Sequence, residues 1–197
     1  MMHPVEISSI SEYLHIRVVL GIVVGLGLTH LLGQIARIID NPRRIRLYWV
    51  HMLWVWFVFV YLISFWWWEY RLARVADWTF LLYVFVTLYA MLLFLVSTFV
   101  IPSDAERFGH YREYYYSKRG WFFGTLALVF VAGMVDTLIK GDLYFDSFGN
   151  EIVFRSVGHI GACMVAIWTR KAWFHASYAL IAVAYQLCWI VRKFEVL

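Results

Sequence analysis

The segment YWVHMLWVWFVFVYLISFWWW, residues 48–68, is the stretch of sequence that decides the fold. It holds no acidic residue, no lysine and no arginine, and its only polar side chains apart from the aromatic ones are His51 and Ser64. An α-helix needs about 20 mostly apolar residues to cross the hydrocarbon core of a bilayer. We therefore expect this segment to form a membrane-spanning helix.

Further segments of the same character precede and follow it, so that six candidate spanning helices succeed one another along the chain. Their approximate ranges are 13–38, 47–68, 78–101, 120–139, 153–169 and 172–191. Between the third and fourth, Phe108, Tyr111 and Tyr115 recur at helical spacing, which predicts a short amphipathic cytoplasmic helix at about 104–117, lying on the membrane surface. The predicted fold class is an all-α integral membrane protein with six transmembrane helices, forming a single polytopic domain over residues 1–197.

The composition agrees with this fold class. The chain is 63% hydrophobic and 15% charged, with a mean hydropathy of +0.70, whereas soluble domains are about half apolar and a quarter charged. The net charge of +4 is not gathered into a basic patch, which argues against a nucleic-acid partner. Cys163 and Cys188 form no CxxC motif and no glycine-rich phosphate loop is present, so we expect neither a bound cofactor nor an enzyme.

Lysine and arginine residues indicate the orientation. The first, third and fifth connections hold ten of them, and the opposite side, with the chain ends, holds seven. The positive-inside rule places the richer side in the cytoplasm. We expect both termini outside, in the periplasm, and the protein in a bacterial inner membrane, with the lipid bilayer as its partner and a homo-oligomer or other membrane subunits as further partners.

Small residues at helical spacing predict which helices pack closely, because they let two backbones approach within a membrane. The expected packing positions are Gly21, Gly25, Gly33, Gly158 and Ala162. The segment 48–68 has neither glycine nor alanine. We therefore expect the first, fifth and sixth helices at the centre and the second helix at the periphery.

A first group of polar residues lies inside the predicted helices near the cytoplasmic side: Thr29, His30, Gln34 and His51. Ionisable residues within a membrane helix are functional candidates, because burying them is costly. At a rise of 1.5 Å per residue, His30 and His51 lie roughly 7–11 Å inside the basic boundary on neighbouring helices. Contact between the two rings is therefore geometrically feasible.

A second group lies near the opposite side and comprises Asp136, Thr137, Arg155 and His159, with Glu69 at the end of the second helix. We expect Asp136 to pair with Arg155 or His159, which would lower the cost of burying it. His30 and His51 are 21 residues apart, and Asp136 and His159 are 23 apart. This similarity suggests an inverted repeat of three plus three helices, an arrangement found in many transporters.

The two groups predict a small membrane transporter or channel that moves protons or a small cation between them, because histidine titrates near neutral pH. A first alternative is a non-catalytic structural or accessory subunit of a larger membrane complex. A second alternative is a membrane redox protein that binds haem or quinone, with His30 and His51 as the candidate haem ligands. The residue pattern leaves open which metal, if any, is bound.

Overall fold

The structure, a computed structural model, describes residues 4–40, 46–75, 78–102, 110–141 and 151–194. Its elements are α1 (Pro4–Asp40), α2 (Trp49–Trp68), the short 3-10 helix η1 (Glu69–Arg74), α3 (Phe80–Val100), α4 (Tyr111–Ile139), α6 (Glu151–Trp168) and α7 (Ala172–Phe194). All except η1 include a stretch long and apolar enough to cross a membrane, and the described residues contain no strand. The predicted all-α fold with six candidate spanning helices is confirmed.

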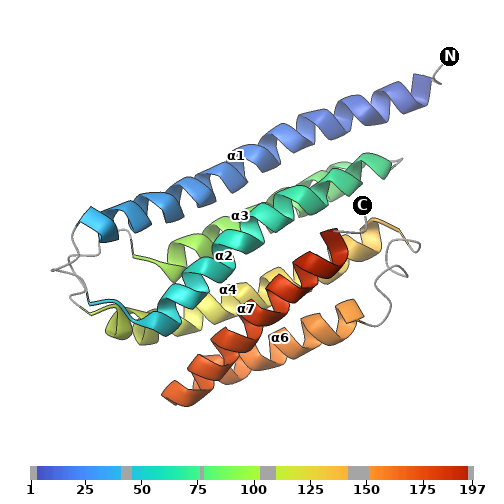
Figure 1. Ribbon diagram of the computed structural model, residues 1–197. Coiled ribbons are helices and arrows are strands. Elements are labelled where there is room, and N and C mark those ends of the chain that lie inside the picture. Colours follow the sequence, from blue (N-terminus) through green and yellow to red (C-terminus); the bar gives the residue numbers. More distant parts are fainter. Residues whose placement is uncertain (1–3, 41–45, 76–77, 103–109, 142–150, 195–197) are drawn as a thin grey trace.

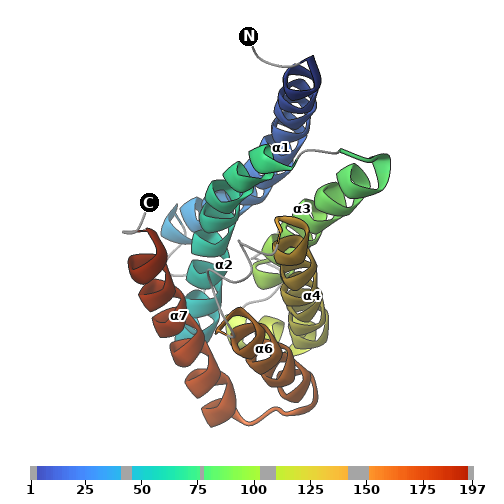
Figure 2. The same cartoon turned by 90° about the vertical axis from the view of Figure 1, so that its right-hand side faces the viewer.

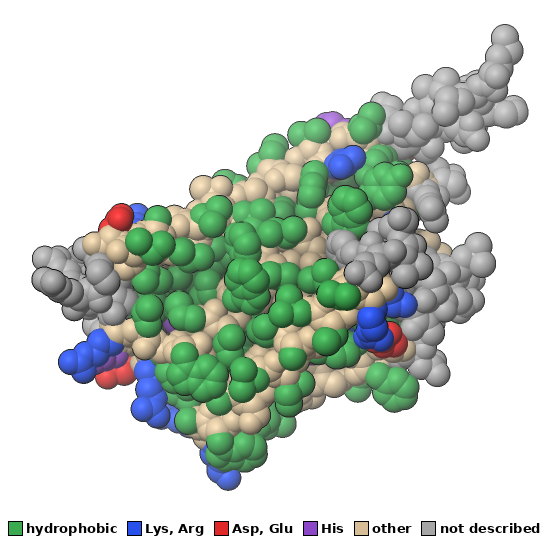
Figure 3. Space-filling view, in the orientation of Figure 1, with side chains coloured by type: hydrophobic (Ala, Val, Ile, Leu, Met, Phe, Trp, Pro, Cys, Tyr) green, Lys and Arg blue, Asp and Glu red, His purple; other side chains and the backbone are tan. Residues whose placement is uncertain are grey.

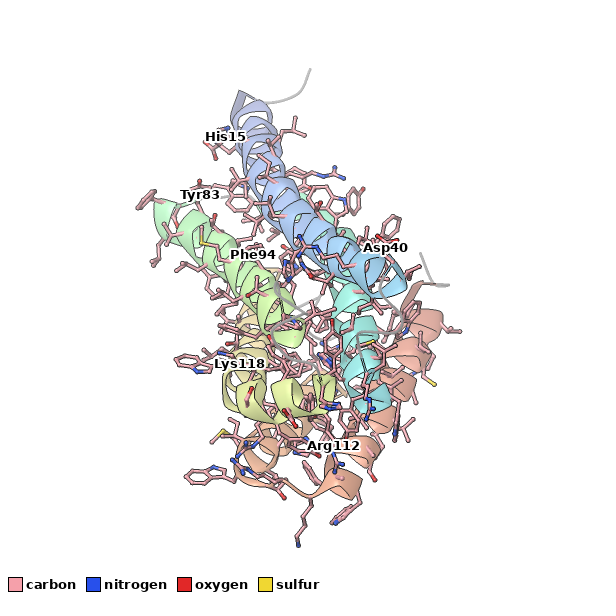
Figure 4. The ribbon with its side chains drawn as sticks, turned by 90° about the vertical axis from the view of Figure 1, so that its left-hand side faces the viewer. His15, Asp40, Tyr83, Phe94, Arg112 and Lys118 are labelled. Carbon is pink, nitrogen blue, oxygen red and sulfur yellow. The ribbon has the colours of Figure 1, made fainter. Side chains whose placement is uncertain are left out.

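Successive helices run in opposite directions, so the two chain termini lie at the same end of the bundle (Figure 1). We call this the terminal end, and we call the opposite end, where α1 leads to α2 and α6 leads to α7, the turn end. Figure 4 looks at the turn end and shows Arg112 and Lys118 near the start of α4 and Asp40 at the end of α1. His15 marks the far part of α1 in the same view.

The outer surface is apolar over its middle. Figure 3 shows hydrophobic side chains covering the centre of one face, while most charged side chains gather towards the two ends. Large apolar residues such as Phe80, Leu81 and Trp168 are 80%, 78% and 81% exposed. Soluble monomers rarely expose large contiguous apolar patches. The surface and the six apolar helices together give the chain the build of a polytopic membrane protein.

The second helix lies at the centre of the bundle. α2 packs against α1, α3, α4 and α7, and its Trp54 is fully buried. The Trp54 ring contacts Phe122 and Phe123 of α4 and Tyr178 of α7, with centroid distances of 5.5, 5.2 and 4.9 Å. The prediction that this helix is peripheral is wrong, because interlocking aromatic rings fill the centre without small residues.

The glycines expected at helix contacts are mostly on open surface. A Cβ added at Gly21 would meet the Trp66 ring at 2.9 Å, so this residue does pack closely. Cβ atoms added at Gly25, Gly33 or Gly158 would meet nothing within 4 Å. α6 packs along α4 and α7 packs along α2, whereas α6 and α7 barely approach each other (Figure 2). The expected tight centre of the first, fifth and sixth helices is therefore wrong.

The described part of the tyrosine-rich segment belongs to a candidate spanning helix. Residues 111–117 form the first turns of α4, and residues 103–109 lie outside the described part of the chain. Tyr111, Tyr114 and Tyr115 are all buried. Their apolar faces pack against the protein interior, so the amphipathic pattern reflects a protein contact and not a membrane surface.

The helix packing differs between the two halves of the chain. α1 packs closely along α3, whereas α4 and α7, their counterparts in the suggested repeat, meet through side chains alone. Likewise α4 and α6 form an extensive contact that is much smaller between α1 and α2. The inverted repeat stays a prediction.

Candidate functional site

A polar cavity lies between α2, α4, α6 and α7 near the terminal end. It encloses about 80 Å³ and is lined by ionisable, hydroxyl and aromatic side chains. The members that matter for its chemistry are Glu69, Asp136, Lys140, Arg155, His159, Tyr61, Tyr89, Tyr185 and Gln186. A water molecule needs roughly 10–15 Å³ of such space, so the cavity has room for several.

A buried ion cluster forms one wall of the cavity. The Lys140 ammonium group donates to Glu69 Oε1 at 3.0 Å and to Asp136 Oδ2 at 2.5 Å. The three side chains are at most 8% exposed. Asp136 and Lys140 are four residues apart at the end of α4, and Glu69 follows α2 directly, so the two helix ends bring the three groups together. The predicted pairing of Asp136 with Arg155 or His159 is wrong, because Lys140 supplies the nearer cation.

Several buried polar atoms in this cavity have no hydrogen-bond partner among the described residues. They are Glu69 Oε2, Asp136 Oδ1 and Arg155 Nε. The Arg155 guanidinium group lies over the Trp189 ring, 4.4 Å from its centroid. Buried polar atoms are nearly always satisfied by protein or by ordered water, so atoms left without partners mark places where water or a ligand binds. The described residues of the wall carry two acidic and two basic groups, so their formal charges balance.

His159 connects this cavity to the middle of the bundle. Its ring stacks on Phe130 at 4.3 Å, and its Nδ1 lies 3.1 Å from the Tyr178 hydroxyl. The same hydroxyl lies 3.3 Å from the Cys163 sulfur and 3.3 Å from the His159 carbonyl. Tyr178 therefore links α7 to α6 through a small polar cluster within an otherwise aromatic interior.

A second histidine–tyrosine pair, His175 with Tyr115, lies nearer the turn end than the pair of His159 with Tyr178. His175 is fully buried, and its Nε2 lies 3.1 Å from the Thr169 carbonyl. A carbonyl only accepts, so Nε2 carries the proton, and the Tyr115 hydroxyl donates to Nδ1 at 2.8 Å. Phe123 contacts the rings of Tyr115, His175 and Tyr178, and so lies between the two histidine–tyrosine pairs.

The sequence-predicted group near the turn end is brought together only in part. His51 is buried against the rings of Tyr111, Tyr114 and Tyr115, and its Nε2 donates to the Val100 carbonyl. This hydrogen bond occupies the nitrogen that a haem iron would need.

The other members of this group have different surroundings. The His30 ring lies beside the next carbonyl along the chain, that of Ile101. Gln34 is buried and its Oε1 has no partner among the described residues, whereas Thr29 is exposed. The two histidines thus meet the same end of α3, and no hydrogen bond or ring contact joins them in the described part of the structure.

The sequence-predicted group near the terminal end is assembled in one place. Asp136, Thr137, Arg155, His159 and Glu69 all line the polar cavity. The Thr137 hydroxyl donates to the Gly133 carbonyl of its own helix at 2.8 Å.

Sequence reasoning missed Lys140 as the partner of both acids, and it missed His175, Tyr115 and Tyr178 as hydrogen-bonding groups. The four-residue spacing of Asp136 and Lys140 is a signal for the first of these. His175 and Tyr115 are 60 residues apart, and no local pattern joins them.

Comparisons with models of protein families, with curated proteins and with solved structures found no match to this chain. The described residues hold no cluster of three or more histidine, cysteine or acidic side chains that could bind a metal ion. The class that the fold and the site define is a polytopic helical protein with a charged cavity enclosed among its apolar helices.

Proposed function

We propose that the protein is a small membrane transporter or channel that transfers protons, with the Glu69–Lys140–Asp136 cluster as its exchange site. The observation that carries this proposal is the pair of buried carboxylates that share one ammonium group, each keeping one oxygen without a partner among the described residues, in a cavity with room for several water molecules. Intramembrane ionisable groups are costly and usually functional. The two carboxylates and one ammonium group of this cluster sum to one negative charge, so the three groups become neutral when they bind a single proton.

The route towards the turn end is proposed to follow the hydroxyl and imidazole groups of the interior. From the cavity it passes His159 and Tyr178, and then Tyr115 and His175, whose Nε2 proton already points at the Thr169 carbonyl. Histidine and tyrosine both donate and accept protons, which such a route requires. The transfer between Tyr178 and Tyr115 needs a water molecule or a side-chain rotation, because no direct hydrogen bond joins them in the described residues.

The orientation in this proposal follows the positive-inside rule. Over the whole sequence, the connections at the turn end hold ten lysine and arginine residues and the opposite side, with the chain ends, holds seven. We place this end in the cytoplasm of a bacterial cell and the charged cavity near the periplasmic face. The proposal needs neither the inverted repeat nor contact between His30 and His51.

The test is proton flux into proteoliposomes, followed with an enclosed pH-sensitive dye under an imposed membrane potential. We expect the parent protein to raise the flux above that of empty liposomes, and we expect Glu69→Gln and Asp136→Asn to lower it at least ten-fold. Asp40→Asn changes an exposed carboxylate at the turn end and serves as the matched control. Equal flux in all four proteins, each folded by circular dichroism, would show that the cluster does not carry protons.

A second candidate is an accessory subunit of a membrane complex. The observation in its favour is that Gly25 and Gly33 of α1 have open space beside them and Thr29 between them is exposed. Such a small-residue face is typical of contacts between membrane helices. Disulfide crosslinking of a Thr29→Cys variant in native membranes would detect a neighbouring copy or subunit, and monomeric, uncrosslinked protein would count against this role.

A further inference from the structure

An apolar groove separates α6 from α7. It encloses about 930 Å³, and its walls are formed mainly by Phe154, Gly158, Ala162, Trp173, Phe174 and Ile181. This volume lies in the range of small-molecule binding sites, which are mostly apolar with a few polar groups. The groove exists because α6 packs on α4 and α7 packs on α2, and because Gly158 and Ala162 put little side chain between them.

The groove adjoins the polar cavity. Arg155, His159 and Tyr185 line both spaces, so they stand where the apolar walls give way to the charged ones. Phe154 and Ile181, on opposite walls of the groove, are 76% and 66% exposed on the apolar surface. A molecule that lies in this groove would therefore approach the polar cavity from the side of the bundle rather than from its ends.

The charges of the cavity indicate what kind of head group fits there. The described wall balances Glu69 and Asp136 against Lys140 and Arg155, so an ionised head group would leave one uncompensated buried charge. The carboxylate oxygens Glu69 Oε2 and Asp136 Oδ1, which have no partner in the described part of the chain, are acceptors, and Arg155 Nε is a donor. An uncharged head group with hydroxyl groups can bond to both the acceptor oxygens and the donor nitrogen, because each hydroxyl donates and accepts.

We infer that the α6–α7 groove binds the apolar chain of an uncharged, hydroxyl-bearing amphiphile whose head group occupies the polar cavity. The chain lies along Gly158 and Ala162, and the hydroxyl groups donate to the free oxygens of Glu69 and Asp136. Binding of this kind is independent of proton transfer, since it requires the groove and the charge balance and not a route to the turn end.

The experiment measures equilibrium binding of three radiolabelled amphiphiles to the full-length protein in nanodiscs. 1-Oleoylglycerol, oleate and oleylamine share one acyl chain and carry an uncharged, an anionic and a cationic head group. We expect 1-oleoylglycerol to bind at least about ten-fold more tightly than the other two. Equal binding of all three would reduce the groove to a non-specific acyl-chain site, and tighter binding of oleate or oleylamine would overturn the charge argument.

Variants separate the groove from the cavity. Gly158→Phe fills the groove from α6 and Ile181→Trp fills it from α7, and we expect each to weaken binding of 1-oleoylglycerol at least ten-fold. Gly25→Phe introduces the same side chain at an equally open glycine of α1 and should leave binding unchanged. Asp136→Asn should lower the preference for the uncharged head group. Parental binding by both groove variants would overturn the assignment, whatever their proton flux.

Discussion

Replacing Lys140 by methionine tests whether the buried ion cluster holds the terminal end of the bundle together. Its ammonium group is the cation shared by Glu69 and Asp136, and its side chain is only 1% exposed. Removing one partner of a buried ion pair costs about 3–5 kcal/mol, because it leaves an uncompensated charge in a low-dielectric interior. Here two carboxylates lose their partner at once, so we expect a loss at the upper part of that range.

The assay is thermal unfolding of the purified protein in detergent. For chains of this size, 1 kcal/mol corresponds to about 2–4 °C in Tm, so a loss of about 4–5 kcal/mol in Lys140→Met should lower Tm by roughly 8–20 °C. Lys118→Met makes the same substitution at an exposed lysine of α4 and should change Tm little. The triple variant Lys140→Met/Glu69→Gln/Asp136→Asn removes every charge of the cluster and should recover most of the loss.

Two results would refute this reasoning. A Tm for Lys140→Met equal to that of Lys118→Met would mean that the cluster contributes nothing to stability. A triple variant as unstable as the single one would mean that lost packing of the Lys140 stem, and not unpaired charge, causes the effect. Both comparisons use the same assay, so differences in detergent affect every variant alike.

Other predictions concern packing, proton flux and thiol reactivity. Gly21→Leu should lower the free energy of unfolding by about 1–3 kcal/mol, because its side chain would meet a tryptophan ring of α2. Gly25→Leu, on open surface, should leave the free energy of unfolding unchanged, and chemical denaturation of the two variants makes the comparison. Tyr178→Phe removes the hydroxyl between His159 and the middle of the bundle. It should reduce proton flux in the liposome assay while leaving Tm within a few degrees of the parent value. Unchanged flux would remove this residue from the route. Cys188 is exposed and Cys163 is buried, so a membrane-permeant maleimide should label Cys188 at once and Cys163 only after denaturation, as read by mass spectrometry.

The sequence predicts the number and order of the long helices well, because length and apolarity are local properties. It does not predict their partners. The segment 48–68 looks peripheral by the small-residue rule, yet Trp54 lies at the centre, where rings from three helices interlock. That arrangement depends on residues from distant parts of the chain, and no periodicity in one segment reports it.

The candidate site follows the same pattern. The number of residues between a side chain and the charged end of its helix gives the depth of that side chain. For this reason Asp136, Arg155 and His159 were expected near one face, and they do line one cavity. Which cation pairs with Asp136 depends on how the ends of α2 and α4 meet, and there Lys140 is nearer than Arg155. Likewise the spacing gives the depth of His30, but it does not predict the carbonyl beside its ring, which belongs to the end of α3.

The separation of α6 from α7 affects how fast an amphiphile bound in the groove can exchange. The two walls of the groove belong to different helix pairs, α4 with α6 and α2 with α7, so they can move apart without disturbing the packing inside either pair. At the turn end a link of three residues, 169–171, joins the walls, and at the terminal end Arg192 and Tyr185 of α7 bond to Glu151 of α6. Between the two ends, the Tyr178 hydroxyl of α7 bonds to His159 of α6. We expect the exchange rate of a bound amphiphile to depend on these contacts between the walls, while its affinity depends on the groove and the cavity. Tyr185 belongs to both sets, because it bonds to Glu151 and also lines the groove, so residence time and affinity share this residue.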